Sequence, residues 1–271
     1  MRGSSRAAAT AGEARLAAVL GAGADPDVVA DELFAAADLI DRNASLRRAM
    51  ADPSRTGQAK RDLVTGLFTG KVSAPTVEVL GELSAQRWAA QRDLTDVMEL
   101  LGIDAVLTSA ERASDLGRVE DELFRFERIV AGNPELRDTL ANRQADPAGK
   151  ASVVDALLEG KVCPQTLCLA RQSVLAPRGR RLEQTIEEYL QRAAARRHQL
   201  TAVVTASAVL SAEQEGRLSA ALAEIYGKDV VLQVVVDPTV LGGVRVRVGD
   251  EVLDGTIARR LDEARRHMAG G

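Results

Sequence analysis

The sequence predicts a mostly helical α+β protein, in which two repeated helical bundles precede a small C-terminal α+β domain. Three observations lead to this fold class. The chain is rich in alanine and only 3% aromatic, a composition that favours closely packed helices. A segment with helical periodicity recurs 90 residues later. Valine-rich segments typical of strands appear only after residue 198.

Residues 31–76 align with residues 121–166 without a gap. Of these 46 positions, 15 are identical, far more than chance would give. The identical residues of the first copy are Asp31, Glu32, Leu33, Phe34, Asn43, Leu46, Arg47, Ala51, Lys60, Val64, Leu67, Gly70, Lys71, Val72 and Thr76. We therefore predict three domains: a first helical copy at 1–100, a second at 101–198, and the α+β domain at 199–271.

The first copy begins with a helix signal at Asp25-Pro26, an N-cap followed by a proline at the first helical position. Apolar residues then recur on one helical face, at Val29, Leu33, Ala36 and Ile40. A loop containing Asp52-Pro53 should follow, then a second apolar stretch ending at Gly70-Lys71-Val72, and then another helix.

The second copy repeats this order of elements. Its amphipathic stripe consists of Leu116, Val119, Leu123, Phe126 and Val130. The corresponding loop is expected at Asp146-Pro147-Ala148-Gly149. Two aromatic residues, Trp88 and Phe124, are interpreted as core residues, with an interface role as the alternative for Trp88.

The C-terminal domain should alternate strands and helices. Residues 200–206 and 230–236 are predicted strands, and the second is apolar enough for burial on both faces. Between them, Ser211 and Gln214 have the spacing of a capping box, and Gly227 should end the helix. This helix should turn Leu218, Leu222 and Ile225 inward. A half-exposed strand with Arg245 and Arg247 between valines, a turn at Gly249-Asp250, a return through Val252 and Leu253, and a last helix near 256–268 complete the domain.

A phosphate-binding loop is the tempting interpretation of residues 66–72 (GLFTGKV). Such a loop needs four residues between its glycines and a hydroxyl after the lysine. Here the glycines are one residue too close and Val72 takes the place of the hydroxyl. The copy at 160–162 (GKV) lacks the first glycine, so a turn that ends a helix explains both.

The remaining candidate sites favour structural explanations. Gly242-Gly243 suits a tight turn between strands, since glycine permits positive φ. Asp250 and Asp254 each lie beside a glycine in a predicted turn, which favours local backbone bonding over acid–base catalysis. Neither His198 nor His267 has a nucleophile as a partner. We predict no catalytic, cofactor-binding or metal-binding residues.

Cys163 and Cys168 are five residues apart, with no further ligands at a spacing that zinc requires. We expect both to be reduced, buried thiols.

Charge and hydropathy narrow the possible partners. The net charge of −4 argues against a dedicated nucleic-acid-binding protein, and the Arg192, Arg196 and Arg197 cluster is interpreted as a solvated helix face. The longest stretch without charged residues, 198–212, is too short and too polar to span a bilayer. Residues 1–10 lack the apolar core of a secretory signal, so we expect a cytoplasmic protein.

Several C-terminal motifs resemble those of the F-type ATP synthase delta subunits and their mitochondrial oligomycin-sensitivity counterparts. These are, in order, 204–211 (VTASAVLS), 237–244 (DPTVLGGV), 248–250 (VGD), 253–256 (LDGT) and 260–261 (RL). The family usually has serine where this chain has Thr256, which keeps the hydroxyl. Residues 180–182 (RRL) resemble the basic turn before the last helix of the family's N-terminal domain. The aromatic residue common near the family's first helix is not evident around 103–107.

The resemblance covers about residues 101–268, the length of an ordinary member, so residues 1–100 indicate an extended form with a duplicated N-terminal domain. It implies a non-catalytic stator subunit on the cytoplasmic face of the bacterial cell membrane. Its helical domain would bind N-terminal segments of the alpha subunits, and its C-terminal domain would bind the b-type stalk. The second copy is expected to keep the contact with the catalytic head, because it directly precedes the C-terminal domain.

Two other classes of function stay open. Arginine-rich helices would suit a helical nucleic-acid-binding regulator, although the chain is acidic and offers no clear reading helix. A small hydrolase or transferase would require a site of converging titratable groups, which the sequence does not indicate.

Overall fold

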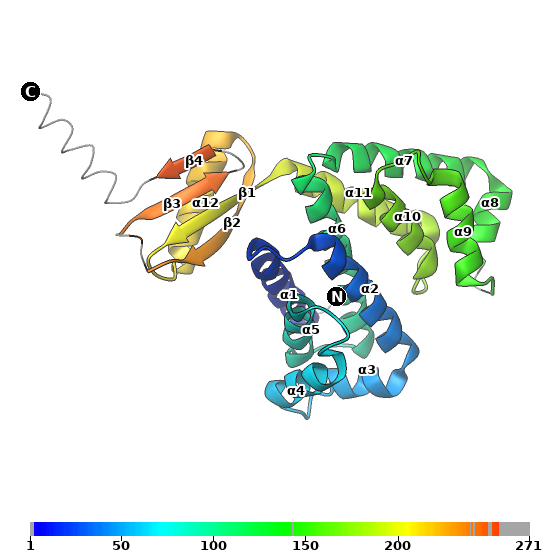
Figure 1. The fold of residues 1–271 in the computed structure, drawn as a ribbon, viewed down its shortest axis with the longest axis horizontal. Coiled ribbons are helices and arrows are strands. Elements are labelled where there is room, and N and C mark those ends of the chain that lie inside the picture. The colour runs from blue at the N-terminus through cyan, green and yellow to red at the C-terminus, as the bar shows by residue number, and fades with distance from the viewer. Residues whose placement is uncertain (1–2, 143, 239, 241, 249–250, 255–271) are drawn as a thin grey trace, which may run out of the picture. The chain divides into compact units, whose positions relative to one another are not determined.

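The computed structural model describes residues 3–142, 144–238, 240, 242–248 and 251–254. The chain forms two compact units, Met1–Ala194 and Ala195–Gly271. The first unit is helical and the second carries the sheet, which confirms the predicted mostly helical α+β class (Figure 1).

The helical unit contains two copies of one bundle. The helices of the first copy are α1 (Gly3–Gly21), α2 (Pro26–Arg42), α3 (Ala44–Ala51), α4 (Gly57–Phe68) and α5 (Ala74–Ala85). Those of the second copy are α7 (Leu116–Gly132), α8 (Pro134–Ala141), α9 (Pro147–Leu158), α10 (Pro164–Leu175) and α11 (Leu182–His198).

A single long helix, α6 (Gln91–Arg112), belongs to both copies. A shift of 90 residues places α1 on α6, and the same shift places α6 on α11. Helix α6 is therefore the last helix of the first copy and the first helix of the second. The expected boundary at residues 100/101 falls inside this helix.

Helix α6 lies between the helices of the two copies (Figure 1), and buried residues occur on all its sides. A helix that is apolar all round is typical of the centre of a bundle. Its closest neighbour is α2, whose Phe34 lies against Gly102. A Cβ at position 102 would be 2.5 Å from the Phe34 ring, so glycine is what allows the aromatic side chain into the core.

Helix starts in the two copies use matching caps. The side chain of Asn43 accepts a hydrogen bond from the Leu46 N–H, and that of Asn133 accepts one from the Leu136 N–H, each at 3.1 Å. The loop expected at 146–149 is wrong for residues 147–149, which belong to α9; only Asp146 precedes the helix. Asp146 caps α9 through the Gly149 N–H, and Pro147 occupies the first helical turn, where its missing N–H costs nothing.

The predicted helical stripes of both copies are confirmed. Val29, Leu33, Ala36 and Ile40 are all buried, as are Leu116, Val119, Leu123, Phe126 and Val130.

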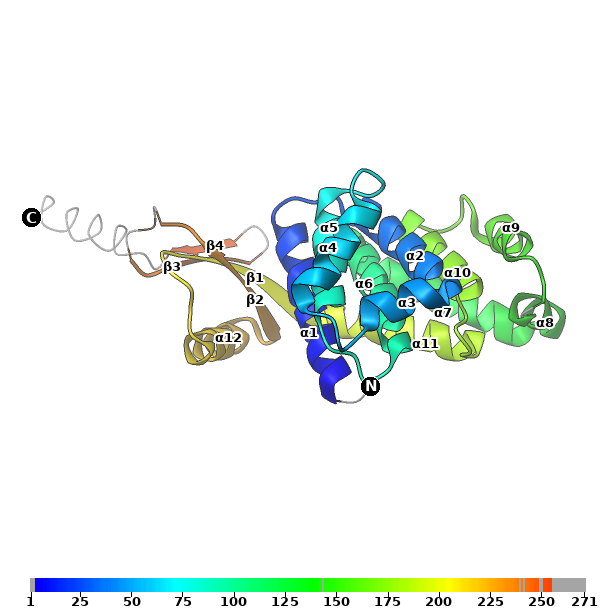
Figure 2. The same ribbon diagram turned by 90° about the horizontal axis from the view of Figure 1, so that it is seen from below.

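The described residues of the second unit form a four-stranded sheet with one helix on one face (Figure 2). The strand order is β2-β1-β3-β4, in which β1 pairs parallel with β2 and antiparallel with β3. The elements are β1 (Gln199–Ala206), α12 (Ala212–Tyr226), β2 (Asp229–Val236), β3 (Val244–Val248) and β4 (Glu251–Asp254). The capping box of Ser211 and Gln214 and the left-handed Gly227 bound α12 as predicted.

Two expectations about burial in this unit are wrong. Strand β2 is an edge strand, and Val231 and Val235 on its second face are each 48% exposed. Ile225 is also exposed, while Tyr226, four residues after the buried Leu222 and so on the same face of α12, packs against the core in its place. The predicted turn at 249–250 and last helix at 256–268 lie outside the described residues.

Candidate functional site

The glycine–lysine–valine segments are turns that end helices, as predicted. Gly70 and Gly160 have φ of 77° and 73°, and the N–H groups of Lys71 and Lys161 bond back to the carbonyls of residues 68 and 158. These N–H groups are engaged within the turn, so they do not form a cradle for phosphate. Gly242 and Gly243 likewise have positive φ, which confirms the tight turn expected there.

Glu32 and Thr76, which are identical to Glu122 and Thr166 of the second copy, take part in the same polar contact in each copy. Glu32 accepts hydrogen bonds from the N–H and hydroxyl of Ser73 and from Thr76. In the second copy, Glu122 accepts from the Cys163 N–H at 2.9 Å. Burial acts to raise the pKa of Glu122, but hydrogen bonds from Cys163 and Arg118 outweigh it and hold the pKa below its usual value. These carboxylates fix the start of α5 and of α10 and are therefore structural.

Both cysteines are free thiols, Cys163 buried and Cys168 partly buried. Burial, with Asp31 and Asp27 nearby, raises the pKa of Cys168 to about 12. Neither cysteine is placed for nucleophilic chemistry, which requires a lowered pKa.

Within the described residues, no group of three or more His, Cys, Asp or Glu side chains is positioned to hold a metal ion. In the same part of the chain, no helix has the length and apolar character that crossing a membrane requires. The side chains of His198, His267, Asp250 and Asp254 lie outside what the structure describes.

The two aromatic residues differ in their environments. Trp88 packs against the core, and its indole N–H donates to the Leu83 carbonyl at 2.9 Å. The interpretation of Phe124 as a core residue is wrong, since it is 55% exposed. Its counterpart Phe34 is buried because Gly102 leaves room for the ring. The residue equivalent to Gly102 in the second copy is Arg192, whose guanidinium pairs with Asp104 instead.

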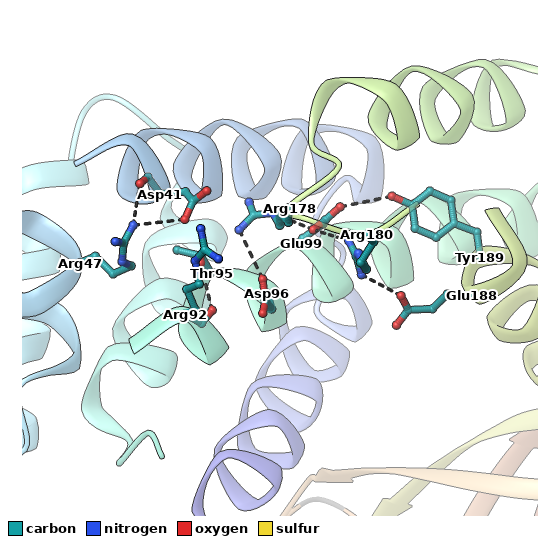
Figure 3. A network of polar contacts seen from close by, with 10 residues as sticks. All are labelled: Asp41, Arg47, Arg92, Thr95, Asp96, Glu99, Arg178, Arg180, Glu188 and Tyr189. Carbon is teal, nitrogen blue, oxygen red and sulfur yellow. Dashed lines mark hydrogen bonds and ion pairs between the residues drawn. The ribbon is translucent and has the colours of Figure 1, made fainter. Parts of the chain in front are cut away.

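A buried ion cluster ties α6 to the loop between α10 and α11 (Figure 3). Glu99 is fully buried, and its carboxylate lies 2.8 Å from Arg178 Nε and 3.0 Å from an Arg180 nitrogen. Tyr189 donates to the same carboxylate at 3.3 Å, and Arg180 also pairs with Glu188. Arg180 belongs to the basic segment 180–182, and α11 begins at Leu182, the last residue of that segment.

Burial raises the pKa of Glu99, although both arginines oppose the shift. Burial and the neighbouring Glu99 also raise the pKa of Tyr189. The cluster has the ingredients of an active site, yet Glu99 is enclosed by its own partners and has no open face for a substrate. We therefore interpret it as a fixed joint in the helical unit.

An apolar groove lies on the first copy between α2 and α4, and we call it the α2–α4 groove. Its volume is about 200 Å³. It is lined by Ala35, Ala36, Leu39, Leu46, Leu67, Phe68, Lys71 and Val72. This volume is below the roughly 300–1,000 Å³ of sites for small molecules, so it suits a few side chains of a partner.

A second candidate surface is the face of the sheet opposite α12. It carries the exposed Val231, Val235 and Val252 beside Arg245 and Arg247. Apolar side chains with arginine at their side are typical of protein interfaces.

Sequence reasoning missed both surfaces. A signal for the groove was present in the repeat, because Leu46, Leu67, Lys71 and Val72 are identical in the two copies. Nothing in the sequence reports that the second face of β2 stays open, since an all-apolar strand suggests the opposite.

Comparison with known proteins identifies the family of this chain. The family model "ATP synthase delta (OSCP) subunit" matches residues 104–268. The "ATP synthase subunit delta" of Kineococcus radiotolerans is 46% identical over 248 residues, covering 92% of this chain and 90% of that protein.

The protein of that name from Streptomyces avermitilis is also 46% identical, over 98% of both chains. The one from Thermobifida fusca is 43% identical over the whole of both chains. The match over full length includes the first helical copy, so these relatives share the extended form. The chain therefore belongs to the ATP synthase delta (OSCP) subunit family, the non-catalytic stator subunits of the F-type ATP synthase.

Proposed function

We propose that this chain links the catalytic head of a proton-translocating ATP synthase to its peripheral stalk at the cytoplasmic face of the membrane. The observation that carries the proposal is the family match along nearly the whole chain. A rotor that turns inside the head exerts torque on it, so a mechanical link is required for proton flow to drive ATP synthesis.

The architecture supports a protein with two binding surfaces. The helical unit binds N-terminal segments of the alpha subunits, and the sheet-bearing unit binds the b-type stalk. The two units differ in fold, so each presents its own kind of surface. The buried cluster around Glu99 supports this role, because a joint held by several ion pairs resists bending under load.

The helical part acts as two modules, residues 1–100 and 101–198. The boundary between them lies within α6, the helix that both bundles use. The second module makes the principal contact with the head, and the first braces a further alpha segment. Their common fold supports a common type of partner.

Size-exclusion chromatography with an isolated catalytic head tests the proposal. Co-elution of one chain per head is expected. Independent elution at micromolar concentration would contradict the head-binding role. Proton-driven ATP synthesis by membranes lacking the chain should fall while hydrolysis by the detached head continues, and unchanged synthesis would contradict the coupling role.

A further inference from the structure

We propose that a cavity between α8 and the start of α11 binds a sugar phosphate, such as the ribose phosphate of a nucleotide. Arg137, Arg181 and the first turn of α11 hold the phosphate group, and Asp138 and Glu183 accept hydrogen bonds from the sugar hydroxyls. The chemistry of this cavity does not depend on the proposed function.

The cavity has the size of a small-molecule site. Its volume is about 550 Å³, within the roughly 300–1,000 Å³ of such sites. It is formed by residues of α8, the end of α10, the turn that follows and the first turn of α11. Leu140, Pro177 and Leu182 give it an apolar wall. A phosphate ion alone leaves most of this space empty, so the ligand that fits carries an organic part.

The first helical copy shows that folding does not require a polar lining here. With the shift of 90 residues, Ser173 and Gln184 of the cavity correspond to Leu83 and Leu94. Both leucines are fully buried in the hydrophobic core. The second copy thus has a serine and a glutamine where the same fold accommodates leucine. Because less apolar burial means less stability, a ligand explains these polar residues better than folding does.

Arg137 is available to a ligand because it lacks the partner that holds its counterpart. In the first copy, Arg47 donates to the Asp41 backbone carbonyl at 2.6 Å and lies 3.2 Å from the Asp41 carboxylate. The residue equivalent to Asp41 is Ala131. Arg137 instead lies 3.8 Å from the adjacent Asp138, whose side chain is 79% exposed. Such an exposed pair contributes little, so the guanidinium can turn to an anion at little cost.

The first turn of α11 supplies backbone donors beside a second arginine. The N–H groups of residues 182–184 have no acceptor among the described residues. Arg181, the residue before the helix, has no side-chain oxygen that could cap them. Its guanidinium is exposed and pairs with no carboxylate in that part of the chain. Free N–H groups at a helix N-terminus favour an oxyanion, and arginine can bind one through two parallel hydrogen bonds.

The acidic residues of the lining select the rest of the ligand. Arg180 also lines the cavity, but it is already paired within the Glu99 cluster and adds little free charge (Figure 3). The carboxylates of Asp138 and Glu183 balance the charges of the other two arginines. A carboxylate accepts hydrogen bonds from hydroxyl groups. A phosphate attached to a sugar therefore matches both the basic and the acidic part of the lining.

Isothermal titration calorimetry of the full-length chain with AMP tests the assignment. AMP should bind more tightly than inorganic phosphate or adenosine, because each of these carries only part of the recognised groups. Arg181→Ala should weaken AMP binding about tenfold, since it removes charge-assisted hydrogen bonds. Arg128→Ala is the matched control, because Arg128 is exposed on α7 in the same copy and does not line the cavity. It should bind AMP within about twofold of the unchanged chain.

The sugar contact has its own variant. Asp138→Ala removes an acceptor for hydroxyl groups and also a negative charge near the phosphate. We therefore expect it to lower the ratio of AMP affinity to inorganic phosphate affinity by about threefold. Helical circular dichroism confirms that each variant is folded.

Several outcomes would overturn the site. These are no binding of AMP up to about 10 mM, equal affinities of the Arg181→Ala and Arg128→Ala chains, or adenosine that binds as tightly as AMP. Succinate that binds more tightly than AMP would assign the cavity to carboxylates, such as acidic side chains of a partner, and would also overturn it. An unchanged affinity ratio in Asp138→Ala would overturn the sugar contact.

Discussion

At the scale of single residues, the buried charges are the most informative feature of this protein. Glu99 is fully buried on α6, and Arg178 beside it has a side chain that is only 8% exposed. Removing the partner of a buried charge strongly destabilises the folded state, whereas a partly exposed ion pair contributes little to stability. The loss of stability on substitution should therefore differ sharply between neighbouring residues of this network.

Glu99→Ala should lower the free energy of unfolding by about 3–5 kcal/mol, because it leaves the buried Arg178 and Arg180 without their carboxylate acceptor and opens a cavity. Glu188→Gln, which touches the half-exposed edge of the same network, should cost no more than about 1 kcal/mol. Urea unfolding followed by helical circular dichroism measures both. Equal losses for the two variants would contradict this account.

The raised pKa of Glu99 also predicts a dependence of stability on pH. The unfolded carboxyl titrates near its ordinary pKa of about 4.3, and the folded one at a higher pH. Between these two values the folded state binds the extra proton, so this group's contribution to stability falls as pH rises through the window. Glu99→Gln should remove that slope. A slope that persists in the variant would assign it to other groups.

Cys168 should be unusually slow to alkylate in the folded chain. With a pKa of about 12, its thiolate fraction at pH 8 is on the order of 10³-fold below that of an ordinary cysteine. Mass spectrometry after iodoacetamide treatment, with the denatured chain as control, measures the rate. Similar rates in the folded and denatured chains would contradict the assigned environment.

At the scale of elements, the close approach of α2 and α6 depends on Gly102. In the interior of a helix, alanine is normally favoured over glycine by about 1 kcal/mol. At this position, however, the added Cβ would meet the Phe34 ring at 2.5 Å. The packing of two helices thus reverses the local preference of the sequence.

Gly102→Ala should therefore destabilise the protein, by about 1–3 kcal/mol. Gly66→Ala is the matched control, because Gly66 lies within α4 and a Cβ there would meet nothing within 4 Å. That variant should gain up to about 1 kcal/mol. Thermal unfolding of both variants decides the point, and a stabilised Gly102→Ala would show that α2 and α6 can separate without cost.

At the scale of the whole molecule, the two helical copies depend on each other, and the sheet belongs to a separate compact unit. Helix α6 completes both bundles, and its buried residues face helices of each copy. A cut in front of α6 and a cut after α11 should therefore have opposite consequences.

A chain of residues 91–271 keeps α6 intact but uncovers its apolar side. We expect this chain to unfold at a lower temperature and to self-associate, as exposed apolar patches do. A chain of residues 1–198 should keep the melting temperature of the helical unit. Circular dichroism measures the melting temperature of each chain, and light scattering measures its self-association. A monomeric 91–271 chain that melts like the full-length protein would show that the second copy is complete by itself.

Local signals in the sequence predicted much of this structure. The caps at Asp25 and Ser211, the left-handed Gly227 and the apolar stripe of each copy depend on neighbouring residues, and all are confirmed. The repeat predicted two bundles of one type, and the motifs after residue 198 predicted the family. These features follow from backbone geometry and short-range periodicity, which a single sequence records directly.

Only the tertiary structure decided what long-range packing controls. It placed α6 in both copies, buried Phe34 but exposed Phe124, and left one face of β2 open. It also gathered Glu99 with Arg178 and Arg180 from opposite ends of the second copy. Burial depends on which helix or strand lies opposite a side chain, and periodicity gives the face of an element without naming its neighbour. For this reason the sequence determined the elements and the family, and the packing of those elements determined the surfaces left for partners.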